Sequence, residues 1–306
     1  MSATSRITFV VAVNDRELFE NNFLASPCFR EIHDHEILVQ ENFASAAKAY
    51  NDAIDRAAHD LIVFAHQDII FSESWLSQLQ RALDYLEVQD PGWGVLGCAG
   101  VNPDGPVWAH LYSSGLGVIG PPFEQPVPIQ TLDEIVLILR KSSALRFDER
   151  LPHFHLYGTD ICLRAAKSGM KSYVIDAFCI HNTHQGLILP EEFYECCRHI
   201  KQAWGDCLPI QTTCIRITRF NIPLYARRLR ETYLRFIRRK EVGGTRVKDV
   251  KRLTERFQEH SQSVQPNCHS EARNGRSKEI SPFMSVHADT WNPPESVDRA
   301  SEKTNG

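Results

Sequence analysis

A histidine and an aspartate interrupt a run of apolar residues in the segment 60–71, DLIVFAHQDIIF. Residues 61–65 form a short, wholly apolar stretch, which is typical of a strand buried in the middle of a parallel sheet. His66 and Asp68 follow two positions apart, so in an extended chain their side chains project to the same side. An imidazole and a carboxylate placed in this way can hold a divalent cation, and the cation can hold a diphosphate. The alternative interpretation is a strand that ends in a polar turn.

The elements expected around this segment are those of an α/β fold. Short apolar runs predict strands at residues 7–13, 36–40, 61–65, 95–100, 135–140 and 172–175. Apolar residues at helical spacing predict helices at residues 44–58, 74–86 and 160–167, with Gly169 as the C-cap of the last one. Ligands of open α/β sheets bind just beyond the carboxyl ends of the strands. His66 and Asp68 are therefore expected at the ligand-binding edge of the sheet.

Residues 91–128 differ from the segments on either side. They hold 8 of the 16 glycines and 7 of the 16 prolines, and no regular period runs through them. This composition predicts loops with short strands. Long loops on a rigid scaffold often carry substrate specificity, and the alternative is an ordered surface excursion without a ligand.

The composition is that of an ordinary soluble enzyme. The chain has 306 residues, of which 42% are hydrophobic and 24% charged, with a formal net charge of −4. This length suits one domain with extensions, and the mild acidity argues against non-specific nucleic-acid binding. The nine cysteines are an odd number without a regular framework, which favours a reducing compartment. They include no Cys-x-x-Cys pair, which argues against a structural zinc site. The N-terminus lacks the apolar core of a signal peptide, so we expect a cytoplasmic protein.

The chain changes character after about residue 214. We predict a catalytic domain at 1–214, a basic amphipathic helical extension at 215–255 and a disordered polar tail at 256–306. Residues 216–252 contain 13 Lys and Arg against 3 Asp and Glu, with apolar residues interleaved. Such a segment suits peripheral contact with an anionic membrane, and the alternative is a helix packed on the domain.

The order of the segments resembles that of the family 2 glycosyltransferases. The segments that carry the resemblance are TFVVAVN at 8–14, SAAKAYNDAIDRAA at 45–58, HQD at 66–68 and FDERLPHFHLYGTDICLR at 147–164. It covers roughly residues 7–190 and is closest to the branch with His-Gln-Asp in place of Asp-x-Asp. The resemblance implies a GT-A fold, in which helices flank a mixed, mainly parallel sheet. It also implies a hexosyltransferase-type enzyme (EC class 2.4) that moves a sugar from a nucleoside-diphosphate donor, with inversion, to a hydroxyl of a glycan, lipid-linked or protein acceptor.

The resemblance also implies roles for individual residues. Asp160 matches the catalytic aspartate segment and is the expected general base; an aspartate at a helix start can also be only a cap. Asp68 and His181 are the expected ligands of a divalent cation, with His184 as the near alternative to His181. Histidine ligands favour Mn²⁺ over Mg²⁺. The residues expected to bind the donor are Val13, Asn14, Asn51, His66 and Asp68.

Two departures from the family pattern keep other functions open. His66 replaces the first acidic residue of the metal motif, and Thr159 replaces a glutamate that often precedes the catalytic aspartate. These changes permit a catalytically silent protein that binds nucleotide sugars. A nucleotidyltransferase is a second alternative, although the sequence AVNDREL after the first strand lacks its glycine-rich basic loop. The pair Asp133 and Glu134 either lines the acceptor side or is an exposed loop pair.

Overall fold

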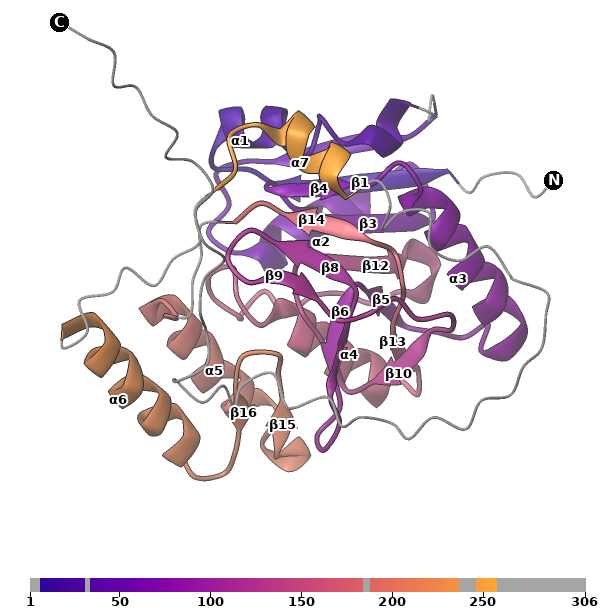
Figure 1. Ribbon diagram of the computed structural model, residues 1–306. Coiled ribbons are helices and arrows are strands. Elements are labelled where there is room, and N and C mark those ends of the chain that lie inside the picture. The colour runs from indigo at the N-terminus through magenta and orange to yellow at the C-terminus, as the bar shows by residue number, and fades with distance from the viewer. Residues whose placement is uncertain (1–5, 31–33, 184–187, 237–245, 258–306) are drawn as a thin grey trace, which may run out of the picture.

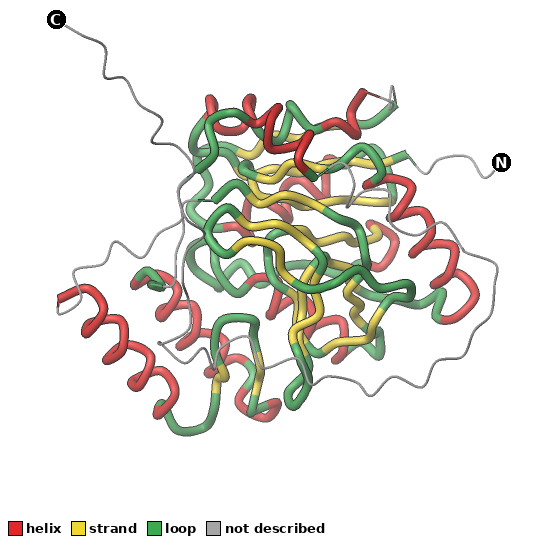
Figure 2. Tube along the Cα trace, in the orientation of Figure 1, coloured by secondary structure: helices red, strands yellow, loops and turns green. Residues whose placement is uncertain are grey.

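The computed structural model of the chain describes residues 6–30, 34–183, 188–236 and 246–257. Its largest sheet has seven strands in the order β10-β13-β5-β12-β3-β1-β2. Strands β13, β5, β3, β1 and β2 run in one direction, and only β10 and β12 run against them. The predicted class, an α/β fold on a mixed, mainly parallel sheet, is confirmed. Figure 2 shows these strands crossing the middle of the molecule with helices around them.

The elements lie close to where the sequence predicts them. The strands are β1 (Ile7–Ala12), β2 (Glu36–Gln40), β3 (Leu61–His66), β4 (Ile69–Phe71), β5 (Val95–Gly97), β6 (Ala99–Val101), β7 (Val107–Ala109), β8 (Leu111–Ser113), β9 (Gly117–Ile119), β10 (Val127–Ile129), β11 (Thr131–Leu132), β12 (Val136–Arg140), β13 (Ser172–Val174), β14 (Cys179–His181), β15 (Ile210–Gln211) and β16 (Arg216–Ile217). The helices are α1 (Arg16–Asn21), α2 (Ala46–Arg56), α3 (Trp75–Gln89), α4 (Tyr157–Lys167), α5 (Glu191–Ala203), α6 (Ile222–Phe236) and α7 (Val250–Arg256). The predicted loops with short strands at 91–128 are confirmed.

The central sheet is buried on both faces because its strands alternate their side chains between two cores. In β3, Ile62 and Phe64 pack with α2, α4 and α5 on one face. Val63 and Ala65 pack with α1 and α3 on the other face. This alternation follows from the two-residue period of a strand. It explains why residues 61–65 read as a continuous apolar run.

One strand predicted from the sequence consists of two strands in the structure. The run 95–100 divides at Cys98 into β5, which belongs to the central sheet, and β6, which pairs with β11 and β7. A side chain at Gly97 would lie 2.8 Å from Leu132 and 3.0 Å from the carbonyl of Val136. The chain can therefore turn between the two sheets here only with a glycine.

The predicted end of α4 is confirmed. Gly169 has φ of +79°, a conformation that favours glycine. The Gly169 N–H donates to the carbonyl of Ala166, and the Met170 N–H donates to that of Ala165. These two bonds form a Schellman motif, which satisfies carbonyls left free at the helix end.

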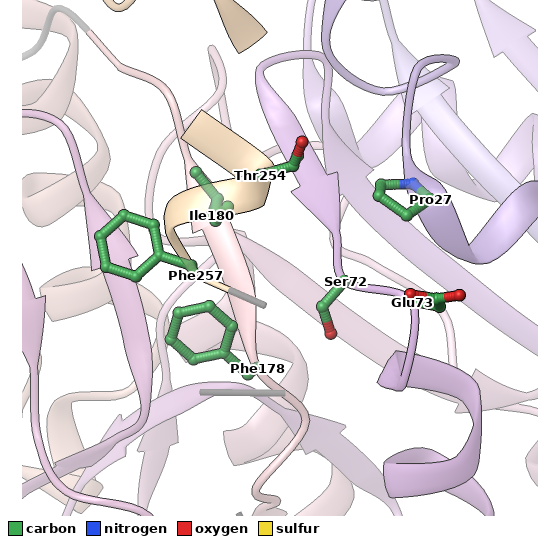
Figure 3. A pocket seen from close by; sticks show the side chains of 7 residues that line it. All are labelled: Pro27, Ser72, Glu73, Phe178, Ile180, Thr254 and Phe257. Atoms are coloured by element: carbon green, nitrogen blue, oxygen red, sulfur yellow. The ribbon is translucent and has the colours of Figure 1, made fainter. Parts of the chain in front are cut away.

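A smaller sheet of four strands, β4-β14-β8-β9, lies against the carboxyl ends of the central strands. Helix α7, orange in Figure 1, packs on it through Leu253 and Phe257, which contact Ile70, Phe178 and Ile180. Figure 3 shows a small pocket of about 20 Å³ at this contact. It is lined by Pro27, Ser72, Glu73, Phe178, Ile180, Thr254 and Phe257. A pocket of this size holds about one water molecule.

The extension predicted at 215–255 contains β16, α6 and α7. Helix α6 lies at the outer margin of the molecule beside α5, whereas α7 lies across the small sheet (Figure 1). Of the tail predicted at 256–306, residues 258–306 lie outside the described part of the chain. None of the described helices is both long enough and apolar enough to cross a bilayer.

Candidate active site

Three polar side chains meet at the carboxyl end of β3. His66 is the last residue of β3, and Asp68 lies in the turn to β4. His181 ends β14, which pairs with β4 so that His181 opposes Ile69. Each of the three side chains offers a ligand atom, and these atoms lie within 4.8 Å of one another. We name His66, Asp68 and His181 the His-Asp-His cluster. His184, the alternative ligand, lies outside the described residues.

Burial and neighbouring charges set the ionisation of the cluster. Burial alone would raise the pKa of Asp68, but the charges of His181 and His66 and a hydrogen bond from His181 outweigh it and lower that pKa to about 2. Burial lowers the pKa of His66 to about 4, and the charge of His181 acts in the same direction. At neutral pH Asp68 is a carboxylate and His66 a neutral imidazole. Both are the forms that bind metal ions.

The donor set fits a divalent cation. His181 Nε2 lies 3.3 Å from Asp68 Oδ1, which is close enough for both atoms to contact one ion. Two imidazoles with one carboxylate suit Mn²⁺ better than Mg²⁺, which prefers oxygen ligands. Three protein ligands also leave coordination positions for phosphate oxygens and water.

Tyr157, the first residue of α4, orients His66. Its hydroxyl donates to the backbone carbonyl of Glu134 at 3.2 Å and lies 3.1 Å from His66 Nε2. Because the hydroxyl proton is directed at Glu134, the oxygen accepts from His66 Nε2–H, which leaves Nδ1 of His66 with the free lone pair. Tyr157 lies within the YGTD segment, but its type gives no sign of this role, and sequence reasoning missed it.

A segment far along the chain reaches the cluster. We name residues 246–257 the C-terminal strap; the Asn182 side chain holds it by pairing with the N–H and the carbonyl of Val247 at 2.8 and 2.9 Å. Arg246 then lies 3.9 Å from Asp68 Oδ2. Its Nε is buried and has no hydrogen-bond partner among the described residues. The strap thus brings a positive charge and a free donor to the edge of the cluster.

Two of the residues expected to bind the donor, Val13 and Asn14, lie beside the cluster. Val13 and Asn14 follow β1, whose Ala12 pairs with His66 of β3. Gln67 ties the two strand ends together: its Oε1 accepts from the backbone N–H groups of Asn14 and Asp15, both at 3.0 Å. Its amide group also donates to the Asn14 side chain at 2.5 Å. The middle residue of HQD therefore fixes the loop after β1, a role that the sequence analysis did not assign.

Asn51 is engaged elsewhere. It lies on α2, 8% exposed, and its side chain pairs with both the N–H and the carbonyl of Phe147 at 3.0 Å. It also donates to Glu149 at 3.1 Å. These contacts anchor the segment before α4. The expected role of Asn51 in donor binding stays a prediction.

Asp160 is enclosed by donors from its own chain. It is fully buried. Its Oδ2 accepts from Arg164 Nε at 2.7 Å and from the N–H of Asp148 at 3.3 Å. Its Oδ1 accepts from Trp204 Nε1 at 2.8 Å. These contacts favour an anchoring role for Asp160, and its expected role as general base stays a prediction.

The loop before β12 brings two other carboxylates towards the cluster. Its Ile135 carbonyl accepts from the N–H of His66, and Glu134 accepts from the N–H of Leu156 at the start of α4. Burial, together with the charge of Asp133, raises the pKa of Glu134 to about 8. Asp133 is half-buried. Gly158 permits this approach, because a Cβ there would lie 2.8 Å from the carbonyl of Leu132. This glycine therefore lets α4 begin close against the loop.

Neither of the two described pockets contains a residue of the His-Asp-His cluster. The small one lies under the strap. The other, of about 500 Å³, is lined by Arg6, Asp60, Leu61, Trp93 and Arg140 among others. These residues lie where β3 begins and β12 ends, at the opposite edge of the central sheet from the cluster. That pocket is therefore unsuited to the ligand expected at the cluster.

Comparison with known proteins gives a family match over most of the folded part. A model described as "Glycosyltransferase like family" matches residues 8–201. A protein of Fuscovulum blasticum described as "ATP synthase subunits region ORF 6" is 28% identical over 167 residues, which cover 52% of this chain and 66% of that protein. The matched part thus spans just under two thirds of that relative.

Solved structures with a similar chain trace are distant in sequence. TarS of S. aureus, residues 1–349, has a TM-score of 0.43 and 15% identity, covering 64% of each chain. The same protein in complex with UDP-GlcNAc has a TM-score of 0.43 and 14% identity, over 64% of this chain and 66% of that one. The mannosyltransferase PcManGT from Pyrobaculum calidifontis, in complex with GDP-Man and Mn²⁺, has a TM-score of 0.40 and 14% identity, over 77% and 71%.

Proposed function

This chain belongs to the glycosyltransferase-like family, and we propose that it transfers a sugar from a nucleoside-diphosphate donor to an acceptor hydroxyl with the help of a divalent cation. The observation that carries the proposal is the His-Asp-His cluster at the carboxyl end of β3. In an open α/β sheet this edge is where ligands bind. The reaction class is that of a hexosyltransferase (EC class 2.4).

The donor is bound by residues from three parts of the chain. The end of β1, with Val13 and Asn14, receives the base, and Gln67 keeps that loop in place. His66, Asp68 and His181 hold the cation, for which we propose Mn²⁺. A bound cation supplies positive charge that stabilises the departing diphosphate. Arg246 adds a second positive charge, and its buried Nε has a free hydrogen for a phosphate oxygen.

The transfer of the sugar needs a general base for the acceptor hydroxyl and a single displacement at the anomeric carbon. The acceptor oxygen forms a bond to the anomeric carbon, the bond from that carbon to the diphosphate breaks, and the acceptor proton passes to a carboxylate. Such a single displacement inverts the configuration at the sugar, as we propose here. For the base we favour Asp133 over Asp160, because Asp133 is half-buried and its loop contacts His66, whereas Asp160 is enclosed.

The proposal is tested with a panel of radiolabelled UDP-, GDP- and dTDP-sugars, each with Mn²⁺, with Mg²⁺ and with EDTA. We expect hydrolysis of the donors that carry one of the three nucleotide bases. This hydrolysis should be faster with Mn²⁺ than with Mg²⁺ and absent with EDTA. Binding without any turnover would identify a silent nucleotide-sugar-binding protein. Release of pyrophosphate from a nucleoside triphosphate and a sugar phosphate would identify a nucleotidyltransferase. Either result contradicts the proposed reaction.

A further inference from the structure

Helix α6 presents a continuous apolar stripe to solvent. Five large side chains lie on one line along the helix, at spacings of three or four residues, which is the period of a single helix face. They are Ile222 (70% exposed), Tyr225 (66%), Leu229 (74%), Tyr233 (46%) and Phe236 (76%). Phe220, just before the helix, is also 70% exposed. Large apolar side chains gathered in this way mark an interaction surface. We name these six residues the α6 stripe.

The opposite face of α6 is fixed to the molecule, so the direction of the stripe is determined. Glu231 is 5% exposed and pairs with Arg227 at 2.8 Å. It also accepts from the Tyr194 hydroxyl at 2.8 Å, which ties α6 to α5. Leu224 packs against the main core. The stripe therefore faces outward because the buried contacts hold it there.

The charge around the stripe is positive. Residues 216–236 contain six arginines and a single acidic residue, Glu231, which is buried. Arg216, Arg227 and Arg228 pair with Asp104, Glu231 and Glu191. Arg219 and Arg230 are exposed and have no ion pair among the described residues. A second copy of the chain docked stripe to stripe would bring these arginines towards each other, which is unfavourable. An apolar stripe with a cationic border instead complements a surface with an apolar interior and anionic groups at its boundary.

We propose that the α6 stripe binds an anionic lipid surface. The apolar side chains enter the boundary between headgroups and acyl chains, and the arginines contact the headgroups. Such a helix lies in the plane of the membrane. The sequence predicts membrane contact somewhere within residues 216–252, and this proposal assigns it to one face of α6. Helix α7 is not available for such contact, because it belongs to the C-terminal strap, which packs on the small sheet.

The position of α6 links this surface to the proposed reaction. In Figure 1, β1 runs from the N-terminus at the right towards the left, so the carboxyl ends of the parallel strands lie on the left, where α6 also lies. Helix α6 therefore lies towards the end of the strands at which the His-Asp-His cluster is found. If the proposed transferase function holds, this arrangement suits a lipid-linked acceptor.

The test is co-sedimentation with vesicles. The full-length protein is mixed with vesicles of phosphatidylcholine alone or with phosphatidylglycerol, at low and high salt. We expect binding to the anionic vesicles only, weakened by salt because the arginine contacts are screened. The double variant Leu229→Ser with Phe236→Ser should bind at least about tenfold more weakly, and Arg219→Gln with Arg230→Gln should lose the preference for anionic lipid. Val88→Ser is the matched control, because Val88 is 77% exposed on α3, away from the stripe.

Two further measurements keep the outcomes distinct. Donor binding, followed by calorimetry, should be equal in all variants, so failure of the lipid proposal does not depend on the proposed transferase function. Light scattering of the free protein reports its oligomeric state. A wild-type dimer that the Leu229 and Phe236 substitutions dissociate would overturn the lipid proposal in favour of a second copy. Absence of vesicle binding, or equal binding to neutral vesicles, would overturn it as well.

Discussion

Asp68 and Asp160 are both buried carboxylates in segments that the family resemblance singles out, yet their surroundings differ in kind. Asp160 accepts hydrogen bonds from a guanidinium, an indole and a backbone N–H, all from its own chain. Asp68 faces two imidazoles and the guanidinium of Arg246, which lies 3.9 Å away. The carboxylate of Asp160 accepts three hydrogen bonds from its own chain, whereas that of Asp68 lies beside two imidazoles that could bind a metal ion with it.

The difference shows that burial of an acid does not by itself indicate chemistry. A buried carboxylate needs donors, and what decides its role is whether the fold provides all of them. Around Asp160 the donors come from α4 and from Trp204 at the end of α5, which favours a role in holding these helices together. Around Asp68 the neighbours are imidazoles of a type that can bind a metal ion, which favours a role in holding a cation.

The largest expected effect is on the Asp68 side of this comparison. We expect Asp68→Ala to weaken Mn²⁺-dependent donor binding at least about 100-fold, since loss of a group that only orients a metal ligand already costs about 10–100-fold. Calorimetry with UDP, GDP and dTDP, with and without Mn²⁺, measures this. Asp176→Ala is the matched control, because Asp176 pairs with His110 at 2.6 Å and has a similar exposed fraction, 12% against 10% for Asp68. Unchanged metal-dependent donor binding in the Asp68 variant would contradict the proposal that Asp68 binds the cation.

For Asp160, the other carboxylate of the comparison, we expect Asp160→Asn to lower the stability of the fold. The amide cannot satisfy Arg164 as the carboxylate does, and we expect the free energy of unfolding to fall by about 2 kcal/mol. Donor affinity and turnover of the folded enzyme should be nearly retained. Thermal melts and steady-state rates measure the two effects. A loss of turnover by a factor of about 10² with an unchanged melt would reinstate Asp160 as the general base.

A smaller effect tests the orientation of the cluster. Tyr157→Phe removes the hydroxyl that accepts from His66 while keeping the aromatic ring. We expect Mn²⁺ affinity to fall by about tenfold, the lower range for loss of a group that orients a ligand. Tyr173→Phe is the control, because Tyr173 is 7% exposed and its hydroxyl donates to Asp90 at 2.7 Å, away from the cluster. Equal Mn²⁺ affinity in wild type and Tyr157→Phe would separate Tyr157 from the cluster.

A further expected effect is a pH dependence of the stability that comes from Glu134. Its pKa is about 8 in the folded protein and about 4.5 in the unfolded chain, so between these values the folded state retains a proton that the unfolded state has lost. The free energy of unfolding therefore falls as pH rises from about 4.5 to about 8. Glu134→Gln removes this contribution. Urea unfolding across this pH range should show a shallower fall for the variant, and parallel curves would contradict the raised pKa.

The sequence predicts local features of the site better than its assembly. The apolar run 61–65 and the HQD that follows it suffice to place a polar turn at the sheet edge, because both signals are local. The glycine end of α4 was predictable for the same reason. The division of 95–100 into β5 and β6 was not, because β6 leaves the central sheet to pair with β11, which lies further along the chain.

The missed residues have partners that are distant in sequence. Arg246 is 178 positions beyond Asp68, and its place depends on the pairing of Asn182 with Val247. For Asp160, the residue type and helix position were as expected, but the donation from Trp204 is a tertiary contact that no motif shows. Residue types indicate what a group can do; only the fold shows which partners it has.

The strap gives the site a thermodynamic property of its own. Arg246 and a cation at the His-Asp-His cluster are both attracted to the Asp68 carboxylate, so each weakens the binding of the other. A diphosphate reverses the sign of this coupling, because its negative charge lies between two positive ones and attracts both. The affinity for cation should therefore rise when nucleotide is present, and the strap should dock more tightly in the ternary complex. A nucleoside without phosphates lacks this negative charge and should leave the affinity for the cation unchanged.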